Sequence, residues 1–124
     1  MKAEKLLKYC QGKKGAYLDF PFGDDYAVVK IRTSSKRNGY IFAEFFVKDG
    51  EEKFTFSTSA EDAEFLRENI PDAVTRGWHC PPVQAKYKST AVLSRLDDVL
   101  LEKLADVSYE RAFSKLTAKE KSDL

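Results

Sequence analysis

The sequence has few of the residues that build metal centres and disulfide frameworks. Its 124 residues include two cysteines, Cys10 and Cys80, and one histidine, His79. A structural zinc site needs about four ligands at short local spacings, which these residues do not provide, so we expect no metal site. A Cys/His catalytic pair is disfavoured because adjacent strand residues point to opposite faces. We interpret Cys10 as a small buried apolar residue. His79 is interpreted as a partly buried structural residue or, alternatively, as a binding contact.

Long apolar runs are also missing. No stretch approaches the roughly 18 consecutive apolar residues of a membrane-spanning helix. Residues 1–8 lack the apolar segment of a secretory signal. We therefore expect a cytoplasmic protein with reduced thiols that does not act at a membrane.

Sequence motifs for catalysis are absent as well. The chain has no Gly-x-Gly-x-x-Gly or Gly-Lys-Ser/Thr phosphate loop and no Gly-x-Ser-x-Gly nucleophile motif. Asp24 and Asp25 are adjacent, which is typical of a turn rather than of two carboxylates that face one substrate atom. We therefore predict that the protein is not an enzyme and has no catalytic residue and no cofactor.

Charge of neither sign is in excess, because 21 Lys and Arg oppose 20 Asp and Glu, for a net charge of +1. This balance argues against a protein held to nucleic acid mainly by bulk charge. The charges are nevertheless segregated. Positive blocks occupy residues 1–16, 27–43 and 72–96, and negative blocks occupy residues 17–26, 44–71 and 97–124. The sequence therefore leaves open either a mixed, solvated surface or a local basic face.

What the sequence does contain is 43% hydrophobic residues, which suffices for one folded domain. Apolar spacing and capping signals predict helices over residues 2–11, between the N-cap Ser59 and Pro71, and from Asp97 or Asp98 onward. Apolar spacing and turn signals predict strands over residues 26–33, 40–48, 53–57, 73–79 and 87–94. The order α-β-β-β-α-β-β-α predicts a two-layer α+β sandwich with a largely antiparallel five-stranded sheet covered by helices. Residues 1–116 form this domain, and residues 117–124 are expected to be a polar, frayed tail.

Regular alternation in residues 40–48 predicts two different faces. One face carries Ile41, Ala43, Phe45 and Val47, and the other carries Tyr40, Phe42, Glu44, Phe46 and Lys48. Together with Tyr26, the second face is rich in aromatic residues. It is either an exposed patch for a partner or a surface covered by a helix or by the Phe20–Phe22 turn.

Six segments, taken in order, resemble signatures of the MmcQ/YjbR family. They are YC (9–10) with GAYLDFPFG (15–23), AVVK (27–30), NGYIFA (38–43), AEDAEFLR (60–67), GWH (77–79) and VSYE (107–110). The resemblance spans about residues 4–116 and implies a fold similar to CyaY-like and type III secretion-chaperone-like domains. The chain departs from the family pattern at Ser57, where Lys is usual, and at Cys80-Pro81-Pro82, where Met-Asn-Lys is usual. A later family Trp is replaced by Tyr87.

The resemblance implies DNA binding through a double-wing arrangement of loops, here residues 33–39 and 80–86. Phosphate contacts are then expected from Lys30, Arg32, Lys36, Arg37, Arg76, Lys86 and Lys88, with aromatic contacts from Tyr40, Trp78 and Tyr87. We therefore predict a non-enzymatic DNA-binding module that contacts phosphates through basic hairpin loops. The alternative is a protein–protein interaction or chaperone-like module, or a homodimer, that uses the aromatic sheet face.

Overall fold

The computed structural model describes residues 1–34 and 38–124. The helices are α1 (Ala3–Gln11), α2 (Ala60–Asn69), α3 (Asp98–Phe113) and α4 (Ala118–Ser122), with short 3-10 turns η1 (Pro82–Gln84) and η2 (Leu93–Arg95). The strands are β1 (Ala16–Asp19), β2 (Ala27–Ile31), β3 (Tyr40–Lys48), β4 (Glu51–Ser57), β5 (Val74–Arg76) and β6 (Lys88–Val92). Within the described ranges, no helix combines the length and the apolar character needed to cross a bilayer.

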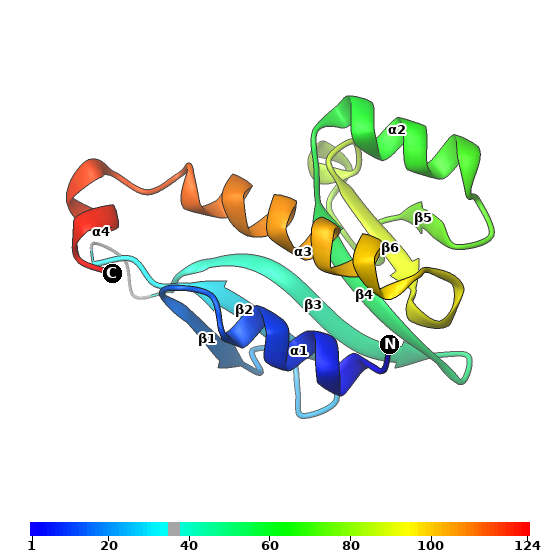
Figure 1. Ribbon diagram of the computed structural model, residues 1–124, viewed down its shortest axis with the longest axis horizontal. Coiled ribbons are helices and arrows are strands. Elements are labelled where there is room, and N and C mark those ends of the chain that lie inside the picture. The colour runs from blue at the N-terminus through cyan, green and yellow to red at the C-terminus, as the bar shows by residue number, and fades with distance from the viewer. Residues whose placement is uncertain (35–37) are drawn as a thin grey trace.

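One antiparallel sheet contains all the strands of the described residues, in the order β1-β2-β3-β4-β6-β5. Helices α1 and α3 contact each other and pack on the same face of the sheet, whereas α2 lies beside β5 (Figure 1). The predicted α+β sandwich is therefore confirmed. The sheet has six strands rather than five, because β1 was not expected. All four of its residues are half-buried, so β1 lacks the contrast between faces that identifies a strand in a sequence.

The core lies between the sheet and the two helices that cover it. Its fully or almost fully buried members include Leu6, Cys10, Ile31, Phe45, Phe54, Phe56, Leu101 and Ala105. Helices α2 and α3 begin where side chains cap them. Ser59 Oγ accepts the Asp62 N–H at 3.1 Å, and Asp97 Oδ1 accepts the Leu100 N–H at 2.7 Å. Asp97, and not Asp98, is therefore the N-cap of α3.

Strand β3 departs from regular alternation at Phe42. Neighbouring residues of β2 pair with Ala43 and Ile41, which leaves Phe42 bulged out of the ladder. The bulge exchanges the faces of the residues that precede it. Ile41 lines the outer face with Glu44, while Tyr40 lies beneath Lys115, in the turn that follows α3. The two faces predicted for residues 40–48 are therefore wrong at the start of the strand.

The aromatic residues on the outer face are partly covered by loops. Tyr26 stacks on Phe46 with ring centroids 5.0 Å apart, and Phe22 meets the Tyr26 ring edge-on. Trp78 lies nearly parallel to Phe46 at 6.3 Å. Phe42 packs instead on Tyr109 of α3. The aromatic residues proposed for a partner thus belong to two different faces of the sheet, and a protein partner or a homodimer stays a prediction.

Residues 117–124 do not form the frayed tail that was expected. They contain α4, whose start has a reciprocal capping box between Thr117 and Glu120. Glu120 is buried, and the Leu124 side chain packs against Gly15. This polar segment is therefore folded back onto the end of β1 by caps and by one terminal leucine.

Candidate functional site

Strands β3 and β4 separate at one end of the sheet, and the separation creates a groove. Their pairing stops at Glu44 and Thr55. Beyond that point β3 continues to Tyr40 alongside β2, while β4 continues to Ser57 alongside β6. Figure 1 shows the two strands diverging, with α3 crossing beside them. Backbone groups that would otherwise join the two strands therefore need other partners.

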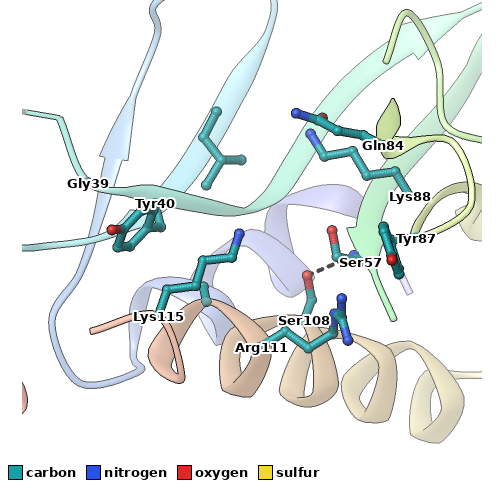
Figure 2. A pocket seen from close by; sticks show the side chains of 11 residues that line it. Gly39, Tyr40, Ser57, Gln84, Tyr87, Lys88, Ser108, Arg111 and Lys115 are labelled. Atoms are coloured by element: carbon teal, nitrogen blue, oxygen red, sulfur yellow. Dashed lines mark hydrogen bonds between the residues drawn. The ribbon is translucent and has the colours of Figure 1, made fainter. Parts of the chain in front are cut away.

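Ser108 of α3 supplies those partners. Its buried Oγ donates a hydrogen bond to the Phe42 carbonyl at 2.5 Å and accepts one from the Ser57 N–H at 2.9 Å (Figure 2). The next residue, Tyr109, packs its ring on Phe42 and donates its hydroxyl proton to the Lys14 carbonyl at 2.6 Å. The Ser-Tyr pair therefore fixes α3 across the separated strands.

The groove, called here the cationic groove, has a volume of about 340 Å³. It is lined by Gly39, Tyr40 and Ile41 on one side, by Ser57, Gln84, Tyr87 and Lys88 on the other, and by Ser108, Arg111 and Ala112 of α3 with Lys115 of the turn that follows. None of these described lining residues is acidic. Figure 2 shows Arg111 of α3 and Lys115 of the turn after it on one side of a space that Lys88 and Gln84 approach from the opposite side.

Aromatic rings contact the two cations Arg111 and Lys115 in the groove. The Arg111 guanidinium lies 5.3 Å from the centre of the Tyr87 ring, and Lys115 Nζ lies 5.5 Å from the centre of the Tyr40 ring. No described carboxylate lies within ion-pair distance of either cation, whereas Lys88 Nζ is 3.0 Å from Glu44. Two positive charges thus face the groove without an acidic partner.

Backbone packing shapes both walls. A Cβ on Gly39 would lie 2.1 Å from the Ile31 carbonyl oxygen, so only glycine lets β3 approach β2 at this point. On the opposite wall, Arg67 of α2 donates to the carbonyls of Ala85 and Lys88 and to Ser89 Oγ. These bonds fix the segment that carries Tyr87 and Lys88.

The structure brings together only part of the predicted site. Tyr40, Tyr87 and Lys88 line the cationic groove, and Lys86 lies over the Tyr87 ring at 5.3 Å. Trp78 lies on the outer face of the sheet instead. The groove thus gathers Gly39 from the first predicted wing and Gln84 from the second, together with residues that follow each wing.

Other predicted cations lie elsewhere. Lys30 is only 5% exposed and pairs with Asp19 at 2.8 Å, so it is not free for a phosphate. Arg32 lies beside the C-terminal segment, and Arg76 donates to the Cys80 carbonyl at 3.3 Å. Lys36 and Arg37 lie outside the described residues, so their contribution stays a prediction.

Sequence reasoning missed Arg111, Lys115 and Ser108 as site residues. Arg111 lies in the last turn of α3, whereas Lys115 lies in the turn that follows the helix. No local signal in the sequence indicates that these two residues face the separated strands.

Groups suited to metal binding are not found in the described ranges, where no three His, Cys, Asp or Glu side chains come together. Both cysteines are free and buried. His79 is exposed rather than partly buried, and its backbone φ is 53°. The interpretation of His79 as a buried structural residue is therefore wrong.

Solved structures of other proteins have the same fold. A protein of Deinococcus radiodurans, described as a DUF419 domain, matches with a TM-score of 0.86 and 23% identity over 98% of this chain and 86% of its own. A protein of Pseudomonas syringae matches with a TM-score of 0.72 and 17% identity over 90% of this chain and 99% of its own. Among curated proteins, no sequence matches. The YjbR family model matches residues 11–111, and the chain therefore belongs to the YjbR family.

Proposed function

We propose that the protein binds nucleic acid, DNA in the first instance, and that the cationic groove contacts the phosphate backbone. The observation that carries the proposal is the pair Arg111 and Lys115. Both face the groove over aromatic rings, and neither has a carboxylate partner among the described residues. Phosphate recognition requires such cations, and aromatic rings beside them offer stacking surfaces for bases. The proposal concerns binding alone.

The groove also offers groups that complete a phosphate contact. Tyr40 and Tyr87, which carry hydroxyls, and Gln84, which carries an amide, line the same space. Hydroxyl and amide donors commonly supplement Arg and Lys at phosphate oxygens. The proposal thus moves the contact surface from the tips of the hairpin loops, where the sequence predicts it, to the groove beside α3.

Replacing Arg111 and Lys115 tests the proposal. We expect Arg111→Gln with Lys115→Gln to weaken the binding of short fluorescent oligonucleotides, measured by anisotropy at salt concentrations from about 50 to 200 mM. Each lost phosphate contact lowers the slope of log affinity against log salt by about 0.7–0.9, so the double variant should lose about 1.4–1.8.

The matched control is Lys103→Gln, which removes an exposed lysine of the same helix outside the groove. It should leave the affinity and the slope close to those of the unmodified chain. Equal affinity and slope for the unmodified chain and the double variant would refute the proposal.

A further inference from the structure

A second cavity opens on the outer face of the sheet, directly beside the cationic groove. Its volume is about 480 Å³, within the range of about 300–1,000 Å³ typical of small-ligand sites. We call it the aromatic cavity, and it is lined by Phe22, Tyr26, Ile41, Glu44, Trp78, His79, Cys80, Pro81, Gln84 and Lys88. Ile41, Gln84 and Lys88 line both cavities. One ligand could therefore reach both.

The walls of the aromatic cavity are flat rings already held in place. Tyr26 is stacked on Phe46, Phe22 meets Tyr26 edge-on, and the His79 ring lies 4.1 Å from the Trp78 ring. Phe22 is 66% exposed and Trp78 is 37% exposed. The chain also holds His79 in the left-handed backbone region, which is uncommon for a residue other than glycine. Ring surface is thus presented to solvent at some conformational cost.

A buried carboxylate forms the polar end of this cavity. Glu44 is 7% exposed. Its Oε1 accepts the Tyr26 hydroxyl at 2.7 Å, and its Oε2 accepts Lys88 Nζ at 3.0 Å. A carboxylate has about four acceptor positions, so about two remain for a ligand. Burial, and then the negative charge of Glu44, raises the pKa of Tyr26, so its hydroxyl stays a donor at neutral pH. The open requirement at Glu44 is a hydrogen-bond donor on the ligand.

From these features we infer that the aromatic cavity binds a nucleobase bearing an exocyclic amino group, whose phosphate lies in the cationic groove. The inference rests on the proposed function and specifies its ligand. The base stacks on the exposed rings and donates its amino N–H to Glu44, while Arg111 and Lys115 hold the phosphate. Gln84 lies where the two cavities meet, and its amide can contact the base or the sugar.

The same chemistry favours an unpaired nucleotide over a base inside a duplex. In a duplex the amino group is engaged by the opposite strand and both faces of the base are stacked. Adenine and cytosine carry an exocyclic amine, whereas thymine and uracil carry carbonyls at the corresponding position. The ligand is therefore a single-stranded segment with one base turned out, or a free mononucleotide.

The experiment uses Trp78, the one tryptophan of the chain, as the reporter. Its fluorescence is titrated with adenosine, cytidine and uridine monophosphates and with short single strands of adenine, cytosine or thymine. We expect saturable quenching, with the amino-bearing bases bound about tenfold more tightly, as one well-placed base contact provides. Quenching by mononucleotides alone would identify a free nucleotide as the ligand and refute nucleic-acid binding, whereas quenching by strands supports both proposals.

Two variants separate the inference from the proposed function. Glu44→Gln keeps the shape but offers both a donor and an acceptor, so the preference for amino-bearing bases should fall to near unity. The control Glu51→Gln, which replaces a half-buried acid at the start of β4, should keep the preference. Phe22→Ala removes an exposed wall, which poses little risk to folding, and should weaken the quenching several-fold.

Indifference to the base, or an unchanged preference in Glu44→Gln, would overturn the inference. If salt-dependent binding through Arg111 and Lys115 persisted in that case, the proposed function would stand without it. If the unmodified chain showed neither quenching nor salt-dependent binding, both the inference and the proposed function would be refuted.

Discussion

A single hydroxyl group, that of Ser108, connects α3 to the two strands that separate beside it. Its Oγ forms hydrogen bonds with both the Phe42 carbonyl and the Ser57 N–H. Neither backbone group has a partner across the separation between β3 and β4. A buried backbone group left without a hydrogen bond is costly. Ser108, which is 1% exposed, therefore helps to set the position of α3, and with it the positions of Arg111 and Lys115.

We expect Ser108→Ala to lower the free energy of unfolding by about 1–3 kcal/mol, because the variant leaves a buried acceptor and a buried donor unpaired. Urea unfolding followed by circular dichroism measures this change. Ser94→Ala, an exposed serine, serves as the control and should stay within about 0.5 kcal/mol of the unmodified chain. A similarly small change for Ser108→Ala would contradict the role assigned to its hydroxyl.

Cys10 illustrates a residue whose chemistry is suppressed by its position in the core. Burial raises the pKa of the Cys10 thiol to about 12, and only the thiolate is a good nucleophile. Iodoacetamide near pH 8 should therefore leave Cys10 unmodified in the folded protein and modify it in concentrated urea, as peptide mass spectrometry can determine. Modification of Cys10 under native conditions would mean that the α1 side of the core opens readily.

At the scale of elements, α1 and α3 are joined by one carboxylate. Asp106 of α3 accepts the Tyr9 hydroxyl at 2.7 Å and pairs with Lys13 Nζ at 2.5 Å. Burial acts to raise the pKa of Asp106, but the hydrogen bonds from Lys13 and Tyr9 outweigh it and the pKa is lowered. The hydrogen bond with Asp106 in turn raises the pKa of Tyr9 to about 12. The contact between α1 and α3 at Asp106 is thus strongest when Asp106 is ionised and Tyr9 is protonated.

The contact at Asp106 predicts that the stability of the protein depends on pH. A carboxylate with a lowered folded-state pKa stabilises the fold fully above its ordinary pKa of about 3.9, and that contribution is lost as the pH falls through the folded-state value. Asp106→Asn should therefore be less stable than the unmodified chain near pH 7, and the difference should shrink below about pH 4. The difference is expected to be modest, because the Asp106 side chain is 41% exposed.

Denaturant unfolding at a series of pH values measures the difference, with Glu110→Gln as a control on the exposed side of the same helix. A difference in stability that stayed constant from neutral to acid pH would show that the charge of Asp106 does not stabilise the fold.

Local signals predicted most elements because each signal acts over a few residues. The Asn-Gly and Asp-Gly pairs frame β3 at the residues where it begins and ends, and Ser59 and Asp97 begin their helices through their own side chains. Strand β1 and helix α4 were not predicted. Both are short, and both depend on contacts with distant segments, such as the packing of Leu124 on Gly15.

At the scale of the whole molecule, ion pairs between distant segments neutralise some of the charge of the positive blocks. Such pairs join a carboxylate to Lys13, Lys30, Lys88 and Arg95. The two cations of the groove, Arg111 and Lys115, belong to a block whose sum is negative, and they lack such partners among the described residues.

The sequence by itself determined the class of fold, the order of most elements, the turns and the helix starts. Caps, hairpin turns and apolar periodicity operate through neighbours within a few residues. Only the tertiary structure decided which side chains form the site. The bulge at Phe42 reverses one end of a strand, the separation of β3 from β4 opens the groove, and Asp19 and Glu44 neutralise two of the expected cations. Each of these depends on pairing between distant segments, whose register and ion pairs are set only when the sheet and the helices pack together.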